Sequence, residues 1–308
     1  MTYPRSHLVD PDGGMYHVCS RCVRRAFLCG IDKQTGYNFD HRRQWIEDRL
    51  HMLANVFAVE LYAYAIMSNH YHIVLNVKPR DALQWSDEKV ARKWVTLNPH
   101  KNETEITRNL RQLSLIDDNE RLIVIRKRLG SLSWLMRYLN EPLARLANRE
   151  DGCKGRFWEG RFKSQHLLDE KAVLACMVYV DLNPIRAGLS TDTTKMKFTS
   201  LAKRIAEGKM QDQLQTLNQE KDQLLFSITL DSYIKLVNWT REARRLARST
   251  NSVIPCIPSS EDWIRHYLPT PGHWPRAIGS AKAIKEYARE IGQHWIKSRT
   301  SLQVAWPI

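Results

Sequence analysis

Two histidines that lie two residues apart, His70 and His72, constrain this chain more than any other feature. They sit in an alternating run typical of a β-strand, in which side chains two residues apart project from one face. The apolar face of this run is formed by Tyr71, Ile73, Leu75 and Val77. Both imidazoles therefore lie on the opposite face, where they can act as a pair of metal ligands. The same pattern is also typical of polar residues on the solvated face of a half-buried strand.

The order of the elements around this strand indicates the fold. In chain order we predict strand 15–21, helix 39–56, strand 58–67, the histidine strand, helix 132–148, strand 156–168 and helix 171–182. The short turn at 67–69 joins the second strand and the histidine strand into a β-hairpin. This order is close to the βαββαβ order of ferredoxin-like folds. We therefore expect an α+β fold with a mainly antiparallel sheet and helices on one of its faces.

Two regions differ in character from this fold. Residues 78–130 are polar and irregular with helical pieces, so we interpret them as an insertion that, with the next amphipathic helix, extends to about 150. Beyond residue 195 no strong strand pattern occurs, and 208–220 is expected to be a linker or an exposed helix. We therefore predict a first domain over 1–195 and a mostly helical, basic C-terminal extension over 196–308.

The charge balance favours a polyanionic partner. The chain of 308 residues has 47 Lys and Arg against 33 Asp and Glu, a formal net charge of +14. Nucleic acid is the commonest partner of such a surface, although a basic surface can also serve solubility alone. We find no run of the ~18 consecutive apolar residues that a membrane span needs. The first residues lack the apolar segment of a signal peptide, so we expect a cytoplasmic protein without a membrane partner.

The cysteines do not form a recognisable metal motif. Cys19 and Cys22 make a lone CxxC pair, whereas a structural zinc site needs four ligands. A cytosolic chain keeps its thiols reduced, so we expect free cysteines in and near the first strand.

The apolar helix predicted over 171–182 carries a second candidate group, Tyr179. Three small residues share its helix face: Ala172, Ala175 and Cys176. Small neighbours leave open space beneath the phenol, and Asn183 continues the same face four residues later. Asn183 precedes Pro184, and a residue that precedes proline is disfavoured in helical conformation. A tyrosine buried in the core is the other interpretation of this position.

Three separated segments resemble the motifs of single-tyrosine HUH transposases. They are His70-Tyr71-His72 with the preceding residues 65–69, the segment 156–164, and the segment 179–188. The subgroup that they resemble is the REP-associated tyrosine transposases, over about residues 13–190 and with the motifs in the family's order. Residues 230–239 also resemble the C-terminal extension of longer members. Tyr71 departs from the family, which usually carries an aliphatic residue there, and the insertion is long.

The resemblance implies a fold, an activity and a set of site residues. Residues 1–195 would form the catalytic domain with an HUH nuclease fold, which cleaves and rejoins single-stranded DNA by transesterification. Tyr179 would be the nucleophile and would form a 5′-phosphotyrosine intermediate, leaving a free 3′-OH. A divalent metal ion, Mg²⁺ or Mn²⁺, would be held by His70, His72 and Asn183. The substrate would be hairpin-forming repeat DNA, and the enzyme would act as a monomer or a homodimer.

Basic residues near aromatic ones are candidate DNA contacts, since basic groups bind phosphates. The candidates in the aromatic segment 156–164 are Arg156, Arg161 and Lys163; further candidates are Arg186 just past the apolar helix and Arg241 and Arg245 on one face of a predicted helix, which can also be an ordinary charged, solvated face. Trp158 and Phe162 are expected to belong to the core instead. Two other function classes stay open. One is a nucleic-acid-binding protein that retains the fold without catalysis, and the other is a metal-dependent nuclease that uses water rather than a tyrosine.

Overall fold

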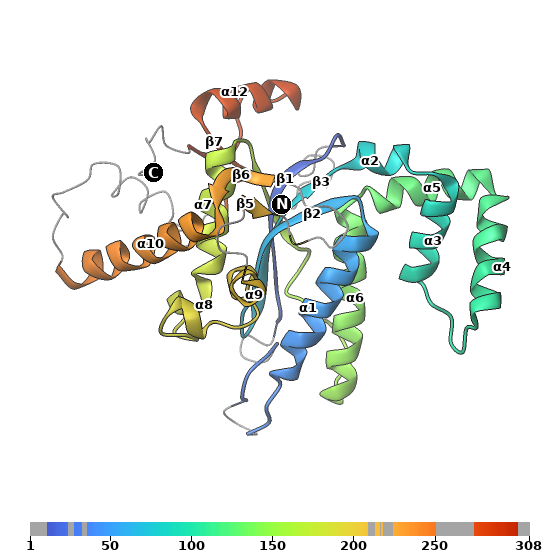
Figure 1. The fold of residues 1–308 in the computed structure, drawn as a ribbon, viewed down its shortest axis with the longest axis horizontal. Coiled ribbons are helices and arrows are strands. Elements are labelled where there is room, and N and C mark those ends of the chain that lie inside the picture. Colours follow the sequence, from blue (N-terminus) through green and yellow to red (C-terminus); the bar gives the residue numbers. More distant parts are fainter. Residues whose placement is uncertain are drawn as a thin grey trace.

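The computed structural model describes residues 11–23, 28–32, 36–208, 213–215, 217, 224–250 and 274–300. The strands are β1 (Gly14–Arg21), β2 (Val59–Ile66), β3 (His70–Val77), β4 (Lys163–Leu167), β5 (Gln213–Gln215), β6 (Leu224–Thr229), β7 (Ala277–Gly279) and β8 (Ser298–Thr300). The helices are α1 (His41–Val56), α2 (Pro79–Gln84), α3 (Asp87–Leu97), α4 (Glu105–Ile116), α5 (Asn119–Leu129), α6 (Leu132–Glu150), α7 (Glu170–Asp181), α8 (Asn183–Arg186), α9 (Ser200–Glu207), α10 (Leu230–Thr250) and α12 (Ala281–Glu290). Figure 1 shows these elements along the chain.

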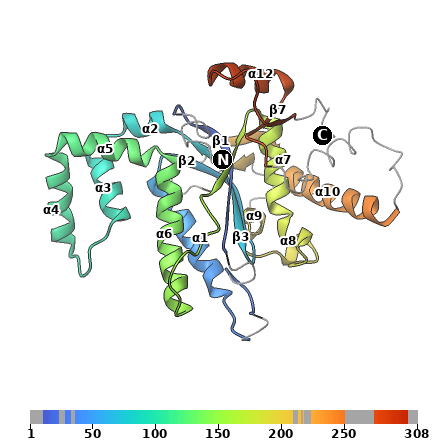
Figure 2. The same cartoon turned by 180° about the vertical axis from the view of Figure 1, so that it is seen from behind.

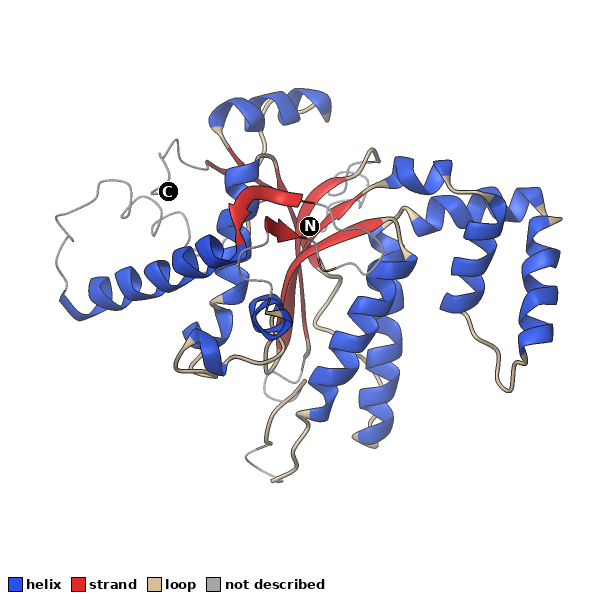
Figure 3. Cartoon of the chain, viewed as in Figure 1, coloured by secondary structure: helices blue, strands red, loops and turns tan. Residues whose placement is uncertain are grey.

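The main sheet has the predicted ferredoxin-like arrangement. Its order is β2-β3-β1-β4-β7-β8, and the first four strands pair antiparallel with one another. Strands β1, β2, β3 and β4 with helices α1 and α6 follow the βαββαβ order. The predicted α+β class is confirmed, and Figure 3 shows the helices gathered around the central strands.

Helices cover both faces of this sheet, so the expectation of helices on one face is wrong. Helices α1 and α6 lie side by side and pack on one face, as both ribbon views show (Figures 1 and 2). Helix α7 packs on the other face against β2 and β3. The physical reason lies in the composition of α7, which is apolar almost all the way round and therefore has to be buried on every side. All eight residues of strand β2 are buried, so this strand is also covered on both faces of the sheet.

Helix α7 begins and ends as its sequence indicates. The side chain of Asp169 accepts a hydrogen bond of 2.8 Å from the backbone N–H of Ala172, which confirms the predicted N-cap. At its other end Leu182 keeps a helical conformation, so Asn183 starts the short helix α8 directly. Pro184 is tolerated there because the first turn of a helix needs no N–H from that residue.

A buried carboxylate fixes the end of α7 to the C-terminal region. The Oδ1 atom of Asp181 accepts hydrogen bonds from Ser200 Oγ at 2.5 Å and from the backbone N–H of Leu201 at 2.9 Å. Its Oδ2 atom accepts a bond of 2.6 Å from the hydroxyl of Tyr233 on α10. One side chain therefore connects α7 with α9 and α10.

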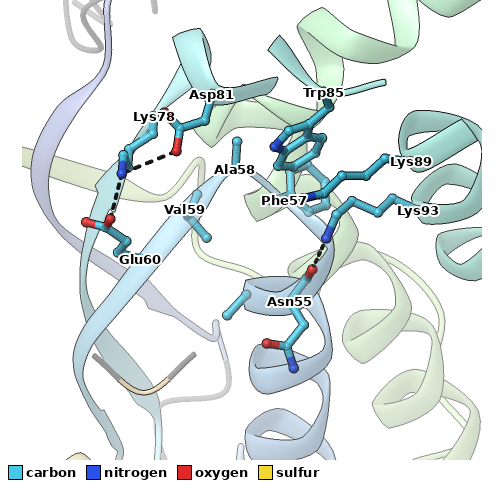
Figure 4. A pocket seen from close by; sticks show the side chains of 11 residues that line it. Asn55, Phe57, Ala58, Val59, Glu60, Lys78, Asp81, Trp85, Lys89 and Lys93 are labelled. Carbon is cyan, nitrogen blue, oxygen red and sulfur yellow. Dashed lines mark hydrogen bonds and ion pairs between the residues drawn. The ribbon is translucent and has the colours of Figure 1, made fainter. Parts of the chain in front are cut away.

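Helices α2 to α5 occupy residues 79–129, which agrees with the helical character predicted for this region. Figure 4 shows its junction with the sheet, a small pocket where Trp85 lies between the ends of β2 and α3. Lys78 at the end of β3 forms ion pairs with Glu60 at 2.8 Å and with Asp81 at 3.2 Å, and Lys93 donates to the carbonyl of Asn55. These bonds attach the insertion at the end of β3 opposite to His70.

Two sequence expectations about strands are corrected. The strand expected over 156–168 forms only over β4, because Trp158 makes a single bridge with Cys22 and the chain then bends at 159–161 before β4 begins. The C-terminal region contains the expected helices, and also β5 to β8, of which β7 pairs in parallel with β4. Part of 208–220 forms β5, not a linker or helix. Strands of three residues are too short for an alternation signal. The domain boundary near residue 195 stays a prediction.

Two simpler expectations concern cysteines and membranes. Cys19, Cys22, Cys29 and Cys176 are buried free thiols, as expected, and Cys153 is free and exposed. Cys256 lies outside the described residues. Within the described ranges no helix combines the length and the apolar character needed to cross a bilayer.

Candidate functional site

Strand β3 places the two histidines on the sheet face that α7 covers. The residues of the other face, Tyr71, Ile73, Leu75 and Val77, are all buried in the core beneath α1 and α6, as predicted. His72 is only 3% exposed, so it does not lie on a solvated face. The Nδ1 atom of His70 lies 2.5 Å from Oδ1 of Asn69. The hydroxyl of Tyr71 donates to Asn140 on α6, which satisfies its polar group within the core.

Helix α7 places the ring of Tyr179 in contact with the ring of His72. The ring centroids of Tyr179 and His72 are 5.6 Å apart, and the two rings meet edge to face. The ring of His70 lies 4.9 Å from that of His72. Tyr179 is half-buried, with its small neighbours Ala172 and Cys176 packed in the apolar cluster beneath the helix. The structure therefore brings together the tyrosine and the histidine pair, which are far apart in the sequence.

Helix α8, which follows this tyrosine, carries two buried polar groups, on Arg186 and Asn183. The guanidinium carbon of Arg186 lies 4.6 Å from the centre of the Tyr179 ring. Its Nε and Nη1 atoms are buried and have no hydrogen-bond partner in the part of the chain that is described. Asn183 is 7% exposed, and its amide nitrogen likewise finds no partner among the described residues. Buried donors without partners cost free energy, so both side chains fit a site that takes a polar ligand.

A third histidine, His17 on β1, belongs to the site and is not among the site residues predicted from the sequence. It is 2% exposed, and its Nε2 atom lies 2.9 Å from Nδ1 of His72. Its Nδ1 atom lies 2.8 Å from Oε1 of Gln165 on β4. Trp274, from the segment before β7, covers it with ring centroids 5.0 Å apart. No motif marks His17, and only the register of β1 between β3 and β4 places it here.

Burial keeps the histidines of the site neutral near pH 7. It lowers the pKa of His17 to about 4 and that of His70, with a smaller effect of the nearby Arg21, also to about 4. Burial and then the adjacent His17 hold the pKa of His72 well below its usual range. A neutral imidazole has the lone pair that a metal ion requires. Burial raises the pKa of Cys19 to about 12, so this thiol is protonated and is a poor ligand.

The donor set fits a metal ion that keeps open coordination positions. Among the described residues no three His, Cys, Asp or Glu side chains converge on one point. The candidate donors are the Nε2 atoms of His70 and His72, whose Nδ1 atoms each contact a neighbour, and the side-chain oxygen of Asn183. Such a set leaves positions for water or phosphate oxygens, which ions such as Mg²⁺ and Mn²⁺ prefer.

The candidate DNA contacts differ in their placement. Arg156, Arg161 and Lys163 are exposed, and Lys163 pairs across the sheet with Cys19, whose partner on the other side is His72. Arg241 is half-buried and forms an ion pair of 2.7 Å with Glu242. The side chain of Arg245 lies outside the described part of the chain.

The aromatic residues of the segment 156–164 belong to the core. Phe157 is 2% exposed, and Trp158 and Phe162 pack against the same apolar cluster. Trp158 also donates a hydrogen bond of 2.8 Å to the carbonyl of Asn140. The expectation for Trp158 and Phe162 agrees with this placement, and Phe157 joins them. Within this segment, the basic residues are therefore the groups that a nucleic acid can reach.

Comparisons with known proteins add one structural similarity. No family model matches the chain, and no curated protein matches it. Among solved structures, the chain is similar to a REP-associated tyrosine transposase bound to a REP hairpin, with a TM-score of 0.36 and 13% sequence identity. The similarity covers 74% of this chain and 97% of that one. At this TM-score the case for a function rests on the side chains of the site itself.

Proposed function

We propose that this protein is a transposase-type enzyme that cleaves and rejoins single-stranded DNA through Tyr179. The observation that carries the proposal is the position of the Tyr179 ring, which meets the ring of His72 edge to face and lies against the guanidinium of Arg186. The resemblance of three motifs to REP-associated tyrosine transposases supports the same reaction. The net charge of +14 agrees with a DNA partner.

The proposed reaction exchanges one phosphoester for another. The hydroxyl oxygen of Tyr179 attacks the scissile phosphorus, and the bond from phosphorus to the 3′-oxygen breaks. The phenol loses one proton and the leaving 3′-oxygen gains one to become the 3′-hydroxyl, so no proton is released overall. The 5′-phosphate stays bound to the tyrosine as an ester. A second 3′-hydroxyl can then attack this phosphotyrosine ester and rejoin the DNA without an external source of energy. The guanidinium of Arg186 lies 4.6 Å from the centre of the Tyr179 ring, and its proposed role is to stabilise the negative charge of the phenolate and the phosphate.

His70, His72 and Asn183 are the residues that we propose to hold a divalent metal ion. When bound, the ion neutralises charge on a non-bridging phosphate oxygen and fixes the orientation of the phosphate. Imidazole ligands favour Mn²⁺ over Mg²⁺ at equal concentration, although Mg²⁺ is compatible with the amide and water positions. Activity should therefore require an added ion and should be lost with a chelator.

The proposed substrate is hairpin-forming repeat DNA, as the motif resemblance implies. Lys163 lies in the same row across the sheet as His72 and is exposed, so it can extend the contact to phosphates next to the scissile one. The monomeric or homodimeric state stays a prediction, and so does the cytoplasmic location.

A covalent-adduct assay tests the proposal. The protein is incubated with Mn²⁺ or Mg²⁺ and labelled single-stranded DNA that carries the repeats flanking its own gene. We expect label to migrate with the denatured protein, and a peptide containing Tyr179 to carry the nucleotide in mass spectrometry. Cleavage without an adduct would indicate a hydrolytic nuclease. Binding of a suitable hairpin without cleavage would indicate a nucleic-acid-binding protein that has no catalytic activity.

Arg186 is expected to contribute strongly to the chemical step. Replacing it with alanine should slow adduct formation by about 10²- to 10³-fold, as the loss of one charge-stabilising donor typically does. Arg186→Lys should restore part of the rate, because lysine keeps the charge but not the planar donor set. The single-turnover rate measures both variants. Arg156→Ala, at an exposed position, is the matched control and should change DNA affinity more than the rate. If Arg156→Ala slowed adduct formation as much as Arg186→Ala, the proposed role of Arg186 in the chemical step would be contradicted.

A further inference from the structure

A continuous series of hydrogen bonds leads from the C-terminal region to His72. The amide nitrogen of Gln165 donates to the carbonyl of Pro275 at 3.1 Å. The Oε1 atom of Gln165 contacts His17 Nδ1 at 2.8 Å, and His17 Nε2 contacts His72 Nδ1 at 2.9 Å. Gln165, His17 and His72 are all buried, at 5%, 2% and 3% exposure, so water does not compete for these bonds.

The chemistry of the groups fixes the direction of every bond in this series. A backbone carbonyl only accepts, so the amide of Gln165 must direct its NH₂ to Pro275 and its oxygen to His17. Because that oxygen also only accepts, the hydrogen of His17 is on Nδ1 and its Nε2 is bare. His17 Nε2 therefore accepts from His72, which places the hydrogen of His72 on Nδ1. The Nε2 atom of His72 is then the nitrogen with the free lone pair.

We propose that His17 is a positioning residue that holds His72 in the tautomer with a bare Nε2, and that Gln165 and Pro275 set its direction. A neutral imidazole otherwise exchanges its hydrogen between both nitrogens, and its ring turns about two bonds. An acceptor that is fixed next to the Nδ1 atom of a ligating histidine restricts both the exchange of the hydrogen and the rotation of the ring, so metal affinity depends on this acceptor. The tautomer follows from geometry alone, and only its purpose rests on the proposed function.

The series also assigns a role to the C-terminal region. Pro275 belongs to the segment that leads into β7, and Trp274 beside it covers the ring of His17. Parallel pairing of β7 with β4, at His166 and Leu167, holds this segment next to Gln165. The extension therefore completes the surroundings of the histidine pair although it contributes none of the proposed ligands.

Nitrogen NMR of the ring atoms tests the tautomer directly. In full-length protein labelled with ¹⁵N-histidine and free of metal, we expect His72 to show a protonated Nδ1 and a bare Nε2. His72→Gln identifies the signal. In His17→Phe, which keeps a ring of similar size, His72 should lose this single tautomer. A wild-type signal with the hydrogen on Nε2, or an unchanged signal in His17→Phe, would overturn the proposal.

Metal binding provides a second readout that does not depend on activity. The dissociation constant for Mn²⁺, measured by calorimetry, should rise by about 10- to 100-fold in His17→Phe. His166→Phe is the matched control, since it changes a buried histidine of β4 whose neighbour Tyr16 lies on the other sheet face. It should leave the affinity unchanged. An equal loss in both variants would show a general packing effect and contradict the proposal.

A milder pair of substitutions covers the case in which His17→Phe does not fold. Gln165→Met keeps the volume but removes the acceptor, so both histidines should show mixed tautomers. Gln165→Glu keeps an acceptor for His17 and should retain the tautomer of His72. Mixed tautomers in both variants would contradict the assigned direction. If wild-type protein shows the expected tautomer but binds no Mn²⁺, the proposed metal site fails while the positioning role stands.

Discussion

Replacing Tyr179 with phenylalanine is expected to abolish the covalent protein–DNA adduct, by at least about 10³-fold, while DNA binding persists. The substitution removes only the hydroxyl oxygen. The ring keeps its contacts with His72 and His17 and its position beside Arg186. The fold should therefore be unchanged, and a loss of adduct would report on chemistry alone.

Tyr71→Phe is the matched control for this experiment. Tyr71 lies between the two histidines in the sequence, but its side chain faces the opposite core and its hydroxyl donates to Asn140. Burial raises the pKa of this tyrosine, which makes it a poor nucleophile. We expect Tyr71→Phe to cost about 1 kcal/mol of stability and to leave the adduct intact. An adduct that persists in Tyr179→Phe on the same denaturing gel would exclude Tyr179 as the nucleophile.

Replacing Asp181 with alanine is expected to lower the free energy of unfolding by about 3–5 kcal/mol. The change leaves the hydroxyls of Ser200 and Tyr233 and the N–H of Leu201 without their acceptor inside the protein. It also removes a carboxylate that acts on the buried Arg204, whose pKa is lowered by burial and raised by Asp181. Because Asp181 joins α7 to α9 and α10, the effect should extend to the position of Tyr179.

Two milder variants separate the contributions at this position. Asp181→Asn keeps one acceptor oxygen, and Ser200→Ala removes one donor, so each should cost about 1 kcal/mol. Urea unfolding followed by circular dichroism measures all three. A loss in Asp181→Ala no larger than that in Ser200→Ala would show that this carboxylate does not hold α7 in place.

The pH dependence should differ between the wild type and Asp181→Asn. Burial raises the pKa of Asp181, so the contribution of this group to stability is largest when it is protonated and falls as the pH rises through its pKa. An asparagine cannot ionise. As the pH rises through the pKa of Asp181, the stability of the wild type should therefore fall relative to that of Asp181→Asn. A stability difference independent of pH would contradict a raised pKa at Asp181.

Much of the fold could be predicted because local patterns carried it. The alternation in β3 placed its apolar residues in the core, and the short turn before His70 identified the hairpin with β2. The cap at Asp169 fixed the start of α7. The three-residue strands β7 and β8 could not be predicted, because each pairs through backbone groups whose partners are remote in the chain.

The candidate site divides in the same way. The sequence by itself determined the types of group at the site, since His70, His72, Tyr179 and Asn183 lie in recognisable motifs. Only the tertiary structure decided what surrounds them. It covered the histidine face with α7, set Arg186 beside the phenol and inserted His17 behind His72. These contacts arise from strand register and helix packing, which depend on the burial of the whole sheet and leave no local pattern in the chain.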